Sequence, residues 1–206
     1  MKKRMLSIVL SGAMAVSTAV SAGSFGAFAV AQCVAYSGSN VNDQDYVQWS
    51  DTVKSYLTVC DNGNYMRVQS GAIKGKLLVE YYSSDFEPLS TKLIDNELPI
   101  FGAFYDSGNN YYVLSGQENP KQNDSLEVFR ITKYDKNWNK IKSCGLYGAN
   151  TTVPFDAGSA RMTHSGDHLL VRTCHEMYKS SDGNNHQSNV TIEVDMPSMT
   201  ITDSYT

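Results

Sequence analysis

The stretch Y-S-S-D-F-E-P-L at residues 82–89 returns 52 residues later as Y-D-K-N-W-N-K-I at residues 134–141. In both copies a short polar turn ending in an aromatic residue, Phe86 or Trp138, separates two runs rich in β-forming residues. Short β-forming runs on either side of a polar turn predict a hairpin. The two copies therefore predict two equivalent hairpins, with strands at 77–82 and 89–94 in one and at 126–134 and 140–144 in the other.

A second kind of hairpin precedes each of these. Its tips contain Gly63, Gly108 and Gly166, each between polar residues and each flanked by β-forming runs. A tight hairpin needs a residue that tolerates a positive φ, which glycine does without steric cost. The glycines lie 45 and 58 residues apart, and a further hairpin at 190–194 and 199–205 follows the third tip.

Two hairpins in series make one four-stranded unit, and the chain shows about three such units, at 50–97, 98–150 and 151–206. Four-stranded units repeating at this period are typical of β-propeller blades. The sequence thus predicts an all-β fold of about three antiparallel propeller-type blades in an open or truncated ring. A β-sandwich with accidental internal similarity is the alternative.

Residues 1–29 have the three parts of a secretory signal peptide: the basic start Lys2, Lys3 and Arg4, an uncharged apolar run, and small residues before two candidate cleavage points, Ala22 and Ala29. The apolar run is short for a membrane span, which needs about 20 residues. The sequence predicts a secreted or cell-surface protein with no membrane span after cleavage, in which residues 30–49 form a linker.

Net charge argues against one class of partner. The chain carries −4, and because residues 1–29 hold three basic and no acidic residues, the mature part carries −7. An acidic surface repels phosphate backbones, so we expect no nucleic-acid partner. No cofactor or metal is expected either, since no C-x-x-C pair occurs and His175-Glu176 lacks the second histidine of H-E-x-x-H.

Four cysteines, Cys33, Cys60, Cys144 and Cys174, remain after residue 29. An even number in an exported chain permits two disulfides, whereas buried free thiols are the alternative. Because Cys144 and Cys174 end strands on the same face of neighbouring predicted blades, we expect a Cys144–Cys174 bridge.

The turn Y-D-K-N-W-N-K-I at 134–141 and the stretch R-T-C-H-E-M-Y at 172–178 resemble uncharacterised secreted β-propeller repeat proteins of Gram-positive bacteria. The similarity extends over nearly all of the mature part. The resemblance implies the fold and an extracellular location, and it implies no known reaction.

Loop lengths predict where a ligand would bind. The expected loops at 69–76, 115–125 and 174–189 are the long ones and lie on one face, and binding residues concentrate on loops held by a rigid scaffold. The third is richest in polar side chains. Together with nearby residues it provides the candidate ligand-binding set Asp156, Arg172, His175, Glu176, Tyr178 and His186.

Three functions remain open on the sequence alone. The first is an extracellular binding or scaffold module that meets a glycan or surface protein. The second is a secreted hydrolase, lyase or transferase using His175 and Glu176, because a histidine titrates near neutrality. The third is a structural repeat. As loop residues, His175 and Glu176 would tolerate replacement by alanine without loss of stability.

Three blades are fewer than the four to eight of closed propellers. We therefore expect apolar outer faces on the first and last blades, which either belong to a longer protein or pair with a second copy.

Overall fold

The structure is a computed structural model that describes residues 52–156, 158 and 160–206. The predicted signal peptide (1–29), the linker (30–49) and Cys33 lie outside these residues. The described part contains thirteen β-strands. It contains no helix with the length and apolar character to span a membrane.

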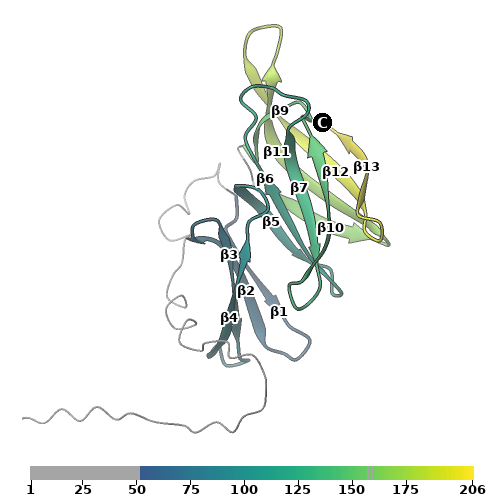
Figure 1. The fold of residues 1–206 in the computed structure, drawn as a ribbon. Helices are drawn as coiled ribbons and strands as arrows, with labels where there is room; N and C mark the ends of the chain where they lie inside the picture. Colours follow the sequence, from purple (N-terminus) through teal and green to yellow (C-terminus); the bar gives the residue numbers. More distant parts are fainter. Residues whose placement is uncertain (1–51, 157, 159) are drawn as a thin grey trace, which may run out of the picture.

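The strands form three antiparallel sheets that lie side by side, each following chain order (Figure 1). The first, which we call blade 1, contains β1 (Ser55–Val59), β2 (Tyr65–Ile73), β3 (Lys76–Tyr82) and β4 (Pro88–Asp95). Blade 2 contains β5 (Ile100–Asp106), β6 (Tyr111–Gly116), β7 (Glu127–Tyr134) and β8 (Lys140–Tyr147). Blade 3 contains β10 (Arg161–Ser165), β11 (His168–Lys179), β12 (Asn185–Asp195) and β13 (Thr200–Tyr205), and the short β9 (Thr151–Pro154) also pairs with β11. The predicted fold class, propeller-type blades in an unclosed array, is confirmed.

Both families of turns have the predicted conformations. Gly63, Gly108 and Gly166 have φ values of 80°, 89° and 56° at the tips of the first hairpins. At the second turns, non-glycine residues occupy the left-handed region at equivalent places: Phe86 at 64°, Trp138 at 63° and Met199 at 49°. A polar side chain supports the first two of these turns, since Ser83 Oγ accepts from the Asp85 and Glu87 amides and Asp135 Oδ1 accepts from those of Asn137 and Asn139.

Blade 2 is the centre of the molecule because it packs on both faces. One face meets blade 1 through a cluster that includes Met66, Val79, Phe104 and Trp138. The other meets blade 3 through a cluster that includes Leu114, Ile131, Val171 and Ile192. The alternation of apolar and polar residues along β11 directs one set of side chains to this second cluster.

One aromatic residue packs the segment that leads into blade 3 against blade 2. Phe155, with φ of 61°, is 3% exposed and lies over Gly102 and Gly116. A Cβ atom on Gly102 would come within 2.4 Å of the Phe155 ring, so β5 has no side chain where that ring packs. The ring also makes an edge contact with Phe129, at 5.4 Å between centroids.

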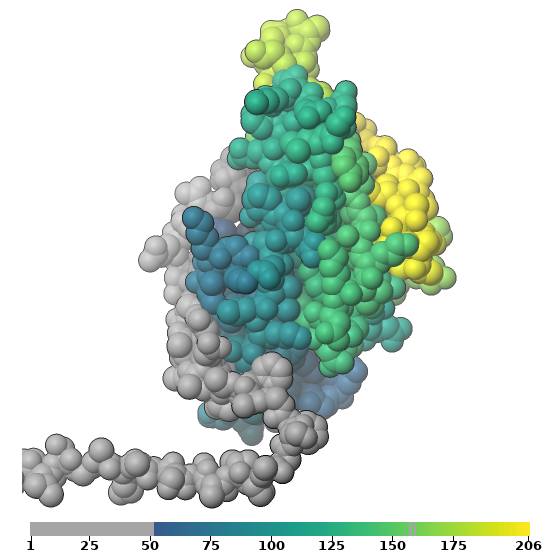
Figure 2. All heavy atoms as spheres, in the orientation of Figure 1, coloured from purple at the N-terminus to yellow at the C-terminus, as the bar shows by residue number. Residues whose placement is uncertain are grey.

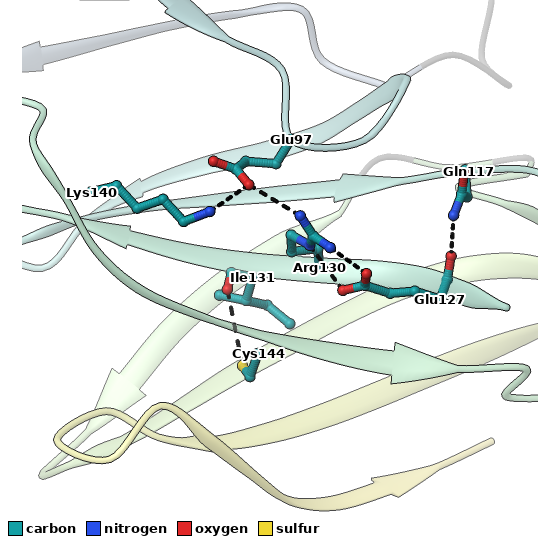
Figure 3. A network of polar contacts seen from close by, with 7 residues as sticks. All are labelled: Glu97, Gln117, Glu127, Arg130, Ile131, Lys140 and Cys144. Atoms are coloured by element: carbon teal, nitrogen blue, oxygen red, sulfur yellow. Dashed lines mark hydrogen bonds and ion pairs between the residues drawn. The ribbon is translucent and has the colours of Figure 1, made fainter. Parts of the chain in front are cut away.

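A polar network fixes the link between blades 1 and 2 (Figure 3). Glu97 follows β4, and its Oε2 accepts from Arg130 at 3.1 Å and from Lys140 at 2.6 Å. Arg130 Nε also donates to Glu127 Oε1 at 2.9 Å. The Glu127 hydrogen bonds are the main cause that raises the pKa of Arg130, so this guanidinium stays charged.

Two of the predicted long loops are largely strand. Residues 69–76 belong mostly to β2 and β3, and residues 174–189 continue β11 and β12 to a turn at 180–184. Residues 174–189 are strand because of β9, a strand that the sequence analysis did not predict. It pairs with β11 at His175, Glu176 and Met177 and so extends the sheet beyond β10.

The outer faces of the two end blades differ from each other. Blade 1 exposes Leu57 (61%), Val59 (63%) and Phe86 (60%). The corresponding face of blade 3 carries charged side chains, including Arg172 and a His168–Glu193 pair at 2.7 Å. The outer face of blade 3 is therefore more charged than that of blade 1, although it also exposes Tyr205 (55%), and pairing with a second copy through the end blades stays a prediction.

Candidate functional site

A polar cleft of about 300 Å³ lies where three segments meet beside the β11–β12 hairpin. The 117–126 loop provides Glu118, Pro120 and Gln122, β9 provides Thr152 and Val153, and the hairpin provides Glu176, Lys179 and Asn185. Figure 2 shows the hairpin tip rising above the rest of the surface, with the atoms of the 117–126 region just below it. The cleft thus lies at one end of the blades, near the only predicted long loop that the described residues retain as a true loop.

Asn119 holds the 117–126 loop in place. It is fully buried, and its backbone N–H donates to the Thr152 carbonyl at 2.7 Å. Its side-chain amide donates to Asn123 O at 3.1 Å and to the Tyr178 hydroxyl at 3.0 Å, and its oxygen accepts from the Asn123 amide at 2.9 Å. One side chain therefore joins the loop to β9 and to β11, which fixes the cleft walls relative to one another.

Glu176 is held by its neighbour on β9. Thr152 Oγ1 lies 2.6 Å from Glu176 Oε1 and donates to that carboxylate, and Thr152 itself is 5% exposed. Asn185 is positioned through its side-chain N–H, which donates to Met177 O at 2.7 Å. Glu176 and Glu118 therefore line the cleft together with the ammonium of Lys179.

His175 lies elsewhere, although it is the next residue to Glu176. It is completely buried, and its Nδ1 lies 2.6 Å from Thr151 Oγ1. Successive side chains of a strand point to opposite faces of the sheet. His175 accordingly points toward the packed side of blade 3, and it does not line the cleft.

The remaining predicted residues do not converge on the cleft either. Arg172 is four residues before Glu176 on the same face of β11, roughly 13 Å away along the strand, and it donates to Thr191 Oγ1 at 2.8 Å. His186 pairs with Asp182 at the hairpin tip, at 2.9 Å. Asp156 accepts from Gln187 at 2.5 Å.

Tyr178 does not line the cleft, and its hydroxyl accepts a hydrogen bond from the Asn119 side chain. Burial, followed by a hydrogen bond to Asp124, raises its pKa, so this hydroxyl keeps its proton.

The predicted disulfide is not formed. Cys60, Cys144 and Cys174, the cysteines within residues 52–206, are all free thiols. Cys144 packs against the cluster between blades 2 and 3, whereas Cys174 lies on the outer face of β11, where its sulfur is 3.3 Å from Asn189 Oδ1. Cys174 shares this face with Arg172, and blade 3 itself separates the two sulfur atoms. Burial raises the pKa of the Cys144 thiol to about 11, so it stays protonated at neutral pH.

The chemistry of the cleft is that of hydrogen bonding. Carboxylates accept, the Lys179 ammonium donates, and the amides of Gln122 and Asn185 can do both. Pro120 and Val153 add small apolar surfaces. Among the described residues, no group of three or more His, Cys, Asp or Glu side chains is arranged to hold a metal ion.

The sequence reasoning found Glu176 and missed Asn119, Thr152 and Lys179. The N-P pair at 119–120 is a turn signal, which is the one local sign that Asn119 has a structural role. Nothing local distinguishes Thr152, because its role depends on β9 pairing with β11.

Comparisons with known proteins identify no family. No family model matches the chain, and no curated protein matches it. Among solved structures, two variants of an apocarotenoid oxygenase from Synechocystis are 10% and 11% identical, with a TM-score of 0.48 for each. The match covers 75% of this chain and 38% of the oxygenase.

A GH43 β-1,3-galactosidase in complex with galactodeoxynojirimycin is 12% identical, with a TM-score of 0.38, over 71% of this chain and 43% of that one. The matches therefore span about two fifths of the length of these proteins. At such identities and TM-scores they say nothing about ligand or activity. The strand order and turns of the chain itself define it as an all-β protein of propeller-type blades.

Proposed function

We propose that this chain is an exported binding module that recognises a hydroxyl-rich glycan in the cleft between the 117–126 loop and the β11–β12 hairpin. The observation that carries the proposal is the lining of this cleft, in which carboxylate, ammonium and amide groups from three separate segments face one space of about 300 Å³.

The size and chemistry of the cleft suit one or two sugar rings. Small-molecule sites begin at about 300 Å³ and use a few placed polar groups for orientation. A sugar hydroxyl both donates and accepts, so it can donate to Glu118 or Glu176 and accept from Lys179. Pro120 and Val153 can meet the apolar C–H face of a ring.

Preorganisation supports binding. Asn119 and Thr152 are buried and hydrogen-bonded, and they hold the loop and Glu176 through contacts within the protein itself. A site that needs little ordering on association loses less free energy to conformational entropy.

The enzymatic alternative depends on His175 and Glu176 acting on one substrate. These side chains lie on opposite faces of β11, and a general base must come within hydrogen-bond reach of the proton that it takes. We therefore favour binding over a reaction that uses this pair.

A glycan array with the purified chain, followed by calorimetry on the best ligand, tests the proposal. We expect Glu176→Gln and Glu118→Gln each to weaken binding about tenfold or more, because a hydrogen bond to a charged group contributes about 1.5–3 kcal/mol. Glu87→Gln, on an exposed turn of blade 1, is the matched control and should bind as the wild type does. Absence of any glycan ligand, or equal affinity in all three variants, would contradict the proposal.

A further inference from the structure

The cleft proposed above as a glycan site carries an uneven distribution of charge. Two carboxylates, those of Glu118 and Glu176, line it together with one ammonium, that of Lys179. The ion pairs within the described residues involve other groups, and none of them joins Lys179 to either carboxylate. The three charged groups therefore leave the cleft with a net charge of −1.

The two carboxylates lie at the same end of the cleft, beside β9. Asn119, the residue after Glu118, donates its backbone N–H to the Thr152 carbonyl at 2.7 Å. The Thr152 hydroxyl in turn donates to Glu176 Oε1 at 2.6 Å. Thr152 thus holds together the two segments that carry the glutamates. The second oxygen of Glu176, Oε2, has no hydrogen-bond partner among the described residues and can accept from a ligand.

The ammonium lies toward the other end, at the neck of the β11–β12 hairpin. Lys179 pairs with Asn185 and follows Glu176 along β11 at roughly 10 Å, given the rise per residue of a strand. Residues three apart in a regular strand point to opposite faces. The register shifts between Glu176 and Lys179, so both side chains line the cleft. The cleft therefore has an acidic end at β9 and a basic end at the hairpin neck.

The other charged residues of the cleft walls leave this polarity in place. Lys121 and Asp124, on the 117–126 loop, have opposite charges and do not line the cleft. Asp182 and His186, at the hairpin tip, contact each other at 2.9 Å and do not line it either.

The acidic end suits a singly charged organic cation. An ammonium group carries only N–H donors, and the carboxylates of Glu118 and Glu176 with the side-chain carbonyl of Gln122 can accept from them. A calcium ion takes about six to eight oxygen ligands. Within the described residues, no group of three or more His, Cys, Asp or Glu side chains could hold such an ion.

We infer that the glycan recognised in this cleft carries a free, protonated amino group, as sugars of the glucosamine class do, with the ammonium between Glu118 and Glu176. The inference rests on the proposed function, since it names the class of sugar for the same site. It also orients the sugar, because Lys179 would repel the amine but can donate to a hydroxyl.

Three disaccharides with the same β-1,4 linkage test the inference, because they differ only in the substituent at carbon 2 of each ring. Cellobiose has a hydroxyl there, diacetylchitobiose an acetamide, and chitobiose a free amine. Calorimetry with the purified chain at pH 6, where an amine is protonated, measures each affinity. We expect chitobiose to bind about tenfold or more tightly than the other two, because its hydrogen bonds join opposite charges. Added salt should weaken the binding of chitobiose and leave that of cellobiose unchanged.

Variants of the cleft should shift the preference for chitobiose over cellobiose in opposite directions. Glu118→Gln and Glu176→Gln each keep a hydrogen-bond acceptor and remove a negative charge, so each should reduce the ratio of the two affinities severalfold. Lys179→Gln keeps a donor and removes the positive charge, so it should increase that ratio. Glu87→Gln, on the exposed turn of blade 1, is the matched control and should leave the ratio unchanged.

The outcomes separate this inference from the proposed function. If cellobiose or diacetylchitobiose binds as tightly as chitobiose, the inference is overturned and the glycan proposal stands. If none of the three binds, the inference is overturned, and binding of pentalysine in their place would overturn the glycan proposal too, because the cleft would then recognise a basic peptide. The inference also fails if Glu176→Gln and Lys179→Gln shift the ratio in the same direction while their melting temperatures match the wild type.

Discussion

Thr151 and Thr152 show how adjacent residues can have separate roles. The first contacts His175 inside the packed side of blade 3, and the second contacts Glu176 in the cleft. Thr151 pairs with Met177 and Val153 with Glu176 in the strand register, so Thr152 lies at a register shift between them. Adjacent side chains of a strand point to opposite faces, which places Thr151 beside His175 and Thr152 beside Glu176. His175 is therefore buried within blade 3, and, unlike a loop residue, its replacement should lower the free energy of unfolding.

Burial of His175 predicts a pH dependence of stability. Desolvation lowers its pKa below the usual value of about 6.5, because burial disfavours the charged imidazolium. The unfolded chain then takes up a proton at a higher pH than the folded chain does. The contribution of neutral His175 to the free energy of unfolding should be complete above about pH 6.5. It should decrease as the pH falls toward the lowered pKa of the folded state.

Chemical denaturation between pH 5 and 7.5 checks this. His175→Asn should be less stable than the wild type at pH 7.5 and should lose much of the slope below pH 6.5. His186→Asn, which changes an exposed residue at the hairpin tip, should keep the slope. An unchanged slope in His175→Asn would show that another group controls it. Should that variant not fold, NMR titration of His175 in the wild type gives the folded pKa directly.

The second turn of each blade was predicted from the sequence, and in blades 2 and 3 its left-handed residue is buried between two blades. Trp138 and Met199 are 4% and 3% exposed, and each packs between its own blade and the preceding one. Trp138 Nε1 also donates to the Tyr81 hydroxyl of blade 1 at 3.1 Å. The equivalent Phe86 of blade 1 is 60% exposed and stacks on Tyr65, with 4.4 Å between ring centroids.

Replacement by alanine should therefore lower the free energy of unfolding by different amounts at Trp138 and at Phe86. Trp138→Ala removes an aromatic ring from the contact between blades and should lower the free energy of unfolding by about 3–5 kcal/mol. Phe86→Ala removes an exposed stacked ring and should cost about 1 kcal/mol. Urea denaturation of both variants measures the difference, and equal losses would mean that the turn position itself, rather than the blade contact, determines the cost.

These turns also explain how much of the fold the sequence could predict. Gly63, Gly108 and Gly166 and the two aromatic turns are local signals, because a positive φ or a hairpin tip restricts the residues allowed there. The twelve predicted strands are all present in the described residues. The strand β9 and the continuation of β11 to Lys179 depend on pairing between distant segments, so local patterns did not reveal them. The cleft was predicted only in part for the same reason, since Glu176 is locally polar but Thr152 and Asn119 act through long-range contacts.

At the scale of the molecule, the three blades are packed unequally. Blade 2 lies between the other two and contributes to both core clusters, and all six residues of β6 are buried. Within residues 52–206 as described, blade 3 packs on one face, and its other face carries charged side chains that include Arg172 and the His168–Glu193 pair. The network around Arg130 further ties β7 and β8 to the link from blade 1.

This inequality predicts an order of local stability. Amides of β6 and β7 should exchange with solvent only through global unfolding, because opening either strand disrupts both interfaces. Amides of the edge strands β10 and β13 need only local opening, since each has one neighbouring strand on its main sheet path and one solvent-facing side. Hydrogen exchange followed by NMR should show the slowest rates in β6 and β7 and rates faster by several orders of magnitude in β10 and β13. If β13 were protected as strongly as β6, its free edge would have to be paired in solution, which would favour association with a second copy along that edge.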